Sequence, residues 1–153
     1  MKRAITVIGC FLFLNCVGCV TVKIPKYLKS ENPYRKEFFA SYKDTLDATK
    51  KTLDVLGWEI TDTVHPSLFE QGADFDEKEN RQVLIFTEAR QTPLFLSSRY
   101  ITLNVYVWPL DNSTNVEIRS FSVTPVLFNN IESYKNDSIV NKIFNQIEKE
   151  LEN

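Results

Sequence analysis

The chain lacks most of the residue types from which catalytic and metal sites are built. Its three cysteines, Cys10, Cys16 and Cys19, all lie within the first 19 of 153 residues, and His65 is its only histidine. A zinc site with several histidine ligands, or a Cys–His catalytic pair, therefore cannot form from the rest of one chain. The two glycines after residue 19 form no phosphate-binding loop. We accordingly predict a protein that is not an enzyme and that uses no metal and no cofactor.

Two polar features of the sequence are still candidates for a metal-binding or catalytic site. The first is an acidic cluster formed by Asp74, Asp76, Glu77 and Glu79. It lacks the spacing of a calcium-binding loop, because Lys78 occupies the third ligand place and Gly72 precedes the acids. A solvated loop is the simpler interpretation, and a carboxylate pair for glycoside hydrolysis is the alternative. The second is His65, which we interpret as a strand-end residue or as a pH-responsive surface group.

The charge balance and the apolar content indicate one folded domain with no nucleic-acid partner. Lys and Arg number 18 against 20 Asp and Glu, a net charge of −2, which gives little attraction for a phosphate backbone. Hydrophobic residues make up 43% of the chain and include 11 Phe and 6 Tyr. That content is sufficient for one modest core without the disulfides that many exported domains use.

The first 19 residues have the layout of an export signal that ends at a cysteine. Lys2 and Arg3 give a positive start, residues 4–14 are apolar, and the small Gly18 precedes Cys19. This layout resembles the signal of bacterial lipoproteins. The resemblance implies that residues 1–18 are removed and that Cys19 becomes the lipidated N-terminus, which holds the protein in the cell envelope. With Val20 following the cysteine, it implies the outer membrane and a domain that faces the periplasm.

An uncleaved transmembrane helix is the competing interpretation of the same region. Residues 4–22 contain only three polar side chains and are long enough to span a bilayer. Two basic residues precede this stretch, and three lysines follow it at positions 23, 26 and 29. The flanking charges therefore show no clear positive-inside bias. We favour the lipoprotein signal, followed by a short tether over residues 19–32 and a single α+β domain over residues 33–153.

Two amphipathic helices are predicted, one near each end of this domain. The first runs from a cap at Asn32 and Pro33 to a stop at Gly57. Its apolar stripe consists of Phe38, Phe39, Tyr42, Leu46, Thr49, Leu53 and Leu56. The second runs over residues 137–152, with a stripe of Ile139, Val140, Ile143, Phe144, Ile147 and Leu151.

Between the helices, four strands are predicted at residues 58–64, 82–89, 99–108 and 116–123, of which the second has apolar residues on both faces. In the first strand Trp58, Ile60 and Val64 share a face, and in the last strand a change of phase predicts a β-bulge. Residues 125–134 fit no pattern. The expected fold is a two-layer α+β structure, in which an antiparallel sheet of about four strands is flanked by the two helices. This order resembles the helix-grip domains of exported lipoproteins, including the C component of the outer-membrane β-barrel assembly machinery.

The strand at residues 99–108 supplies the candidate contact surface. Ile101, Leu103, Val105 and Val107 alternate with larger polar and aromatic residues and should face the helices. On the opposite, open side we expect the contact row, which consists of Tyr100, Tyr106 and Trp108 with Arg119 and Glu117 on the neighbouring strand. These residues either stabilise a solvated sheet through cross-strand pairs or form a patch that contacts a partner.

These features together predict a membrane-anchored, non-catalytic module that binds an envelope protein or assists an assembly. The alternative is a carrier of lipid or another small ligand, held in a cavity between helix and sheet.

The lipid anchor is testable at one residue. Cys19→Ser should leave an uncleaved precursor without lipid, because the cysteine thiol is the acceptor in lipoprotein processing. Labelled palmitate should enter the wild type and be absent from the variant, with several buried acyl chains contributing about 0.8 kcal/mol per CH₂ to membrane binding. Equal incorporation into both proteins would contradict the anchor and favour the transmembrane helix.

Overall fold

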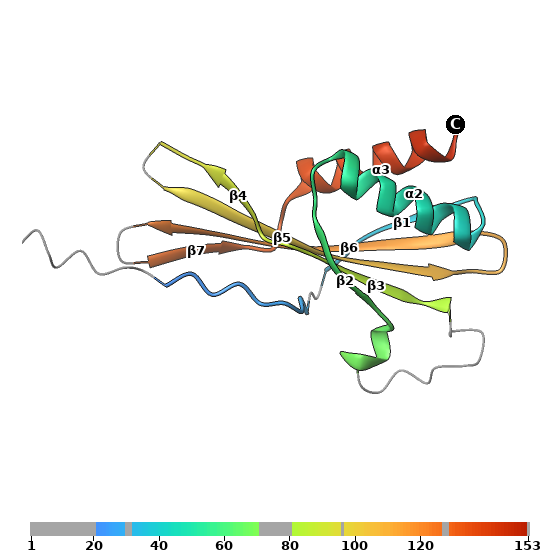
Figure 1. The fold of residues 1–153 in the computed structure, drawn as a ribbon, viewed down its shortest axis with the longest axis horizontal. Coiled ribbons are helices and arrows are strands. Elements are labelled where there is room, and N and C mark those ends of the chain that lie inside the picture. The colour runs from blue at the N-terminus through green and yellow to red at the C-terminus, as the bar shows by residue number, and fades with distance from the viewer. Residues whose placement is uncertain (1–20, 30–31, 71–80, 96, 127–128, 153) are drawn as a thin grey trace, which may run out of the picture.

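Seven antiparallel strands form one sheet within the part of the chain that the computed structural model describes, namely residues 21–29, 32–70, 81–95, 97–126 and 129–152. The strands are β1 (Tyr34–Phe38), β2 (Ile60–Val64), β3 (Val83–Thr87), β4 (Arg90–Pro93), β5 (Ser98–Pro109), β6 (Thr114–Val126) and β7 (Asn129–Ser133). Two helices, α2 (Tyr42–Val55) and α3 (Asp137–Leu151), lie on one side of the sheet (Figure 1). The α+β class with an antiparallel sheet and two helices is confirmed.

The long ribbon of β5 and β6 is the centre of the sheet. Their register is continuous from Tyr100↔Val123 to Pro109↔Thr114. Toward the β5–β6 turn, this ribbon pairs with β1 on one side and with β3 and then β2 on the other. Toward its other end, it pairs with the short strands β4 and β7. The helices cover the first half, and the second half extends beyond them as two hairpins (Figure 1).

The main core lies between the helices and one face of the ribbon. Leu103, Val105 and Val107 of β5 are fully buried there, together with Val116 and Ile118 of β6. The helices contribute Ala48 and Leu53 from α2 and Val140, Ile143, Phe144 and Ile147 from α3. Both the aliphatic row of β5 and the apolar stripe of the last helix are therefore confirmed.

The prediction that the first helix begins at Pro33 is wrong. Residues 34–38 form the edge strand β1, whose alternating positions Tyr34, Lys36 and Phe38 are the more buried ones. The helix begins after Ser41, whose side chain accepts a hydrogen bond from the Asp44 amide as an N-cap. Its predicted end is confirmed, since Gly57 adopts a positive φ of 74° just beyond it.

The predicted count of about four strands is also wrong, because three short edge strands were not recognised. Besides β1, these are β4, in which every residue is exposed, and β7, which is mostly exposed. Strands with no buried face carry no apolar alternation, so the period-2 pattern is missing from both. β7 occupies the stretch of residues 125–134 that fitted no pattern.

The change of phase in β6 has a different cause from the predicted bulge. The β5–β6 register shows no interruption, so Val116 and Ile118 face the helices while Phe121 and Val123 face the opposite side. The strand has apolar residues on both faces because both faces are covered.

The irregularity lies in β2 instead. The β2–β3 register shifts between Ile60 and Asp62. Trp58 and Ile60 consequently belong to the main core, but Val64 packs on the other face of the sheet. The prediction that all three share a face is wrong because of this shift.

No helix within the described residues is long and apolar enough to cross a membrane. Residues 1–18 and Cys19 lie outside the described part, as does the acidic cluster at residues 74–79.

The core assignment of β5 can be tested with a matched pair of leucines. Leu103→Ala should lower the free energy of unfolding by about 2–5 kcal/mol, because it leaves a cavity at a fully buried site. Leu68→Ala, at a residue that is 71% exposed, should change it by no more than about 0.5 kcal/mol. Denaturant unfolding of the two variants measures the difference, and similar losses would contradict the assigned core.

Candidate functional site

The contact row predicted on the open face of the sheet is largely covered. Tyr106 and Arg119 are only 5% and 9% exposed, and Tyr100 and Trp108 are half-buried. The N-terminal segment runs along this face, on the side opposite the helices (Figure 1). The expectation that this side is open to solvent is therefore wrong for Tyr106 and Arg119.

The cover is made by residues 21–29, which we call the N-terminal strap and which were predicted to be part of a free tether. Leu28 is 1% exposed and packs with Phe121 and Val123. Its amide donates to the Asn104 Oδ1 at 2.6 Å, and the Asn104 Nδ2 donates back to the Lys26 carbonyl at 3.0 Å. Apolar contact and backbone hydrogen bonds together thus hold the strap on the sheet.

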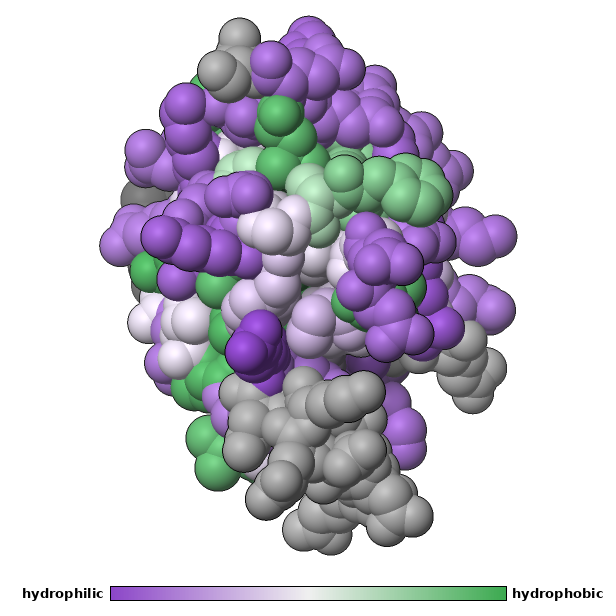
Figure 2. Space-filling view, turned by 90° about the vertical axis from the view of Figure 1, so that its right-hand side faces the viewer, coloured by the Kyte–Doolittle hydropathy of each residue, from purple (hydrophilic) through white to green (hydrophobic). Residues whose placement is uncertain are grey.

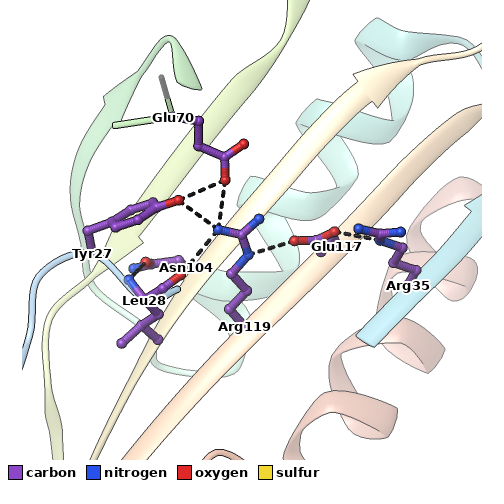
Figure 3. A network of polar contacts seen from close by, with 7 residues as sticks. All are labelled: Tyr27, Leu28, Arg35, Glu70, Asn104, Glu117 and Arg119. Atoms are coloured by element: carbon purple, nitrogen blue, oxygen red, sulfur yellow. Dashed lines mark hydrogen bonds and ion pairs between the residues drawn. The ribbon is translucent and has the colours of Figure 1, made fainter. Parts of the chain in front are cut away.

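Arg119 is the centre of a polar network beneath the strap (Figure 3). Its Nε lies 2.6 Å from the Glu117 Oε1, and its Nη1 lies 2.9 Å from the Glu70 Oε1. The same Nη1 donates to the Tyr27 hydroxyl at 3.0 Å and to the Leu28 carbonyl at 3.2 Å. One guanidinium therefore connects β6, the strap and the segment that follows β2.

Glu117 is shared between two arginines. It is 2% exposed, and its second carboxylate oxygen lies 2.6 Å from the Nε of Arg35 on β1 (Figure 3). The guanidinium of Arg119 also stacks over the Tyr106 ring, 4.4 Å from its centroid. Glu117 and Glu70 together balance the two arginines, so these residues have no excess charge to offer a ligand.

Three members of this network, Arg119, Tyr106 and Glu70, have pKa values shifted away from neutral pH. Burial alone would lower the pKa of the Arg119 guanidinium, but the Glu117 carboxylate raises it above its usual value. Burial raises the pKa of the Tyr106 hydroxyl far above its usual range. Burial alone would also raise the pKa of Glu70, but the hydroxyls of Tyr106 and Tyr27 and the Arg119 guanidinium lower it below its usual value. None of these groups is poised to exchange a proton near pH 7.

The segment after β2 closes the other side of the network. His65 Nδ1 accepts from the Ser67 amide and lies 2.8 Å from the Ser67 Oγ, which makes it the cap of a 3₁₀ turn at Pro66–Leu68. Phe69 then lies between the rings of Tyr27 and Phe86, with centroid distances of 5.3 and 5.1 Å. Through this contact the strap is held by aromatic packing as well as by Arg119.

A separate groove opens where the helix layer meets the hairpin half of the sheet. It has a volume of about 210 Å³. Its apolar lining consists of Leu56, Trp58, Ile101, Ile139 and Ile143, and its polar lining consists of Arg90, Thr92 and Lys142. Because these residues come from four separate segments, no local sequence pattern pointed to the groove.

Two cationic side chains flank this apolar lining. Arg90, on β4, stands over the Trp58 ring at 5.6 Å and donates its Nη1 to the Leu56 carbonyl at 3.0 Å. Lys142, on α3, is exposed and also lines the groove. The groove therefore combines apolar area with positive charge, which suits a ligand with an apolar group beside a carboxylate.

No protein-family model matches the chain, and no curated protein matches it either. Within the described residues, no three or more His, Cys, Asp or Glu side chains are grouped so that they could hold a metal ion.

Removing the central guanidinium tests the network. Arg119→Met should lower the free energy of unfolding by about 3–5 kcal/mol, because it leaves Glu117 buried with only one of its partners. The same change should speed protease cleavage within residues 21–29, since the strap loses its bond at Leu28. The matched control is Lys26→Met at the exposed pair with Asp62, which should cost about 0–1 kcal/mol. Equal effects of the two variants would contradict the role assigned to Arg119.

Proposed function

We propose that the protein is a membrane-anchored lipoprotein of the cell envelope whose domain is a non-catalytic module that binds a protein partner in its groove. The groove of about 210 Å³, with its apolar lining and its two flanking cations, is the observation that carries this proposal. The finer fold that we propose is helix-grip-like, and the packing of α2 and α3 on one face of the sheet supports it.

The anchor is proposed from the sequence alone. Lys2 and Arg3, the apolar stretch and Gly18–Cys19 support export and lipidation at Cys19, and Val20 supports the outer membrane with the domain in the periplasm. The scarcity of histidine and of cysteine after residue 19 supports a binding role over a catalytic one.

The size of the groove favours a protein partner. Pockets that enclose small-molecule ligands are commonly about 300–1,000 Å³, and this groove is smaller. It suits one apolar side chain of a partner, seated between Trp58 and Ile139, with an acidic residue of the partner near Arg90 and Lys142. Anchor side chains of this kind contribute much of the energy of a protein interface.

A carrier of a small amphiphile is the second candidate. The same lining would suit the carboxylate and the first carbons of a fatty acid, with the remainder of the chain outside the groove. Organic extraction of the purified protein separates the two candidates, because a carrier should release about one equivalent of lipid per chain.

The contact row stays a proposed secondary surface. Tyr100 and Trp108 are half-buried and accessible in part, whereas Tyr106 and Arg119 could meet a partner only after the strap moves away.

The groove can be tested with a photo-crosslinking residue at the exposed Thr92, placed in the full chain in cells. It should capture a discrete protein, and Lys142→Glu should lower the yield about tenfold, which corresponds to about 1.4 kcal/mol of binding energy. Lys43→Glu, at an exposed lysine of α2 outside the groove, is the matched charge reversal and should leave the yield unchanged. Equal yields in the two variants would contradict a partner in the groove.

A further inference from the structure

Three separate parts of the chain meet at the end of the sheet that extends beyond the helices. The β4–β5 turn is closed by the Leu94 amide, which donates to the Ser97 carbonyl at 2.8 Å. The Ser97 hydroxyl donates to the Pro125 carbonyl at the end of β6, which joins the two hairpins. On β7, the Asn130 side chain donates to the Thr21 carbonyl at 3.5 Å. The first described residue of the strap therefore lies beside the hairpin tips.

The tips expose apolar side chains. Their exposed fractions are 97% for Phe95, 49% for Leu94, 61% for Ile131 and 41% for Val126. Charge is scarce in the sequence around them, since residues 91–98 and 120–131 contain no Asp, Glu, Lys or Arg, although these types make up 25% of the chain, and the exposed Glu132 is the first carboxylate after them. A cluster of exposed apolar residues without charge marks a surface for another apolar phase or protein.

The opposite end of the sheet differs in character. Hydrophilic side chains predominate there (Figure 2), and the β5–β6 turn carries the exposed Asp111. Phe39 is exposed near this end, between β1 and α2, to 88%. The two ends are separated by the length of β5, whose 12 residues span roughly 36 Å.

We infer that the hairpin tips dock on the lipid bilayer and insert Phe95 and Leu94 among the lipid headgroups. This inference rests on the proposed lipid at Cys19. Thr21 lies two residues after Cys19, a distance of at most about 7 Å along the chain, so an acylated Cys19 places the tips at the membrane surface. Apolar side chains free of carboxylates suit that interface, where an acidic residue would be costly and repelled by anionic lipid.

The experiment uses the full chain, processed and purified from membranes, because its cysteine content allows a single labelled thiol. All native cysteines lie at or before residue 19, so a lipidated wild type should accept no thiol dye. Phe95→Cys introduces one site at the tips, and Phe39→Cys is the matched control at an equally exposed phenylalanine near the other end. Both proteins are labelled with an environment-sensitive dye and placed in vesicles of phosphatidylethanolamine and phosphatidylglycerol that contain a spin-labelled lipid.

The expected result is that the spin-labelled lipid quenches the dye at position 95 at least threefold more than the dye at position 39. Equal quenching in protein that carries palmitate and floats with the vesicles would overturn the docking and leave the lipid anchor intact. A dye at position 95 that is shielded from water yet not quenched would show a protein contact there, and this too would overturn the inference. Protein that carries no palmitate and does not float would overturn the anchor itself, and with it the basis of the docking.

Discussion

Both helices cover the same face of the antiparallel sheet, and the rest of this structure depends on how the other face is covered. The strap of residues 21–29 and the turn at residues 66–70 lie on that face and enclose Phe121, Phe86 and Tyr106. Covering a sheet with irregular chain leaves backbone groups in need of partners, and Asn104 and Arg119 supply them. The buried arginine therefore supplies hydrogen bonds to the strap, while Glu117 and Glu70 balance its charge.

Much of the fold could be predicted where one face of an element is buried over several turns or residues. The row of aliphatic residues in β5 and the stripe of α3 both meet this condition. Residues 34–38 were assigned to a helix because the spacing of Phe38, Phe39 and Tyr42 also fits a helical stripe, and a five-residue strand is too short to outweigh it. β4 and β7 have no buried face, and β6 has two, so in these strands the pattern that reports burial was missing or ambiguous.

The candidate site shows a different limit. The sequence placed Tyr100, Tyr106 and Trp108 correctly on the side of β5 opposite the aliphatic row, since alternation along one strand determines this. It could not reveal that Leu28, 76 residues before Asn104, lies across them, because a segment without periodicity gives no sign of what it packs against. The groove could not be predicted for a related reason, since Trp58, Arg90 and Lys142 are brought together only by the tertiary fold.

With the proposed lipid at Cys19, the docked strap would also determine how far the domain can reach from the membrane. While residues 21–29 lie on the sheet, only Val20 separates Thr21 from the proposed lipidated cysteine, and the proposed anchor would confine the domain to the surface of its bilayer. Release of these nine residues from the sheet would lengthen the tether between Cys19 and the domain by about 30 Å, enough to lift the domain clear of the lipid. The bonds of Arg119 and Asn104 to the strap would thus set the length of this tether, and a variant that breaks them would change how far from the proposed anchor the groove can be presented.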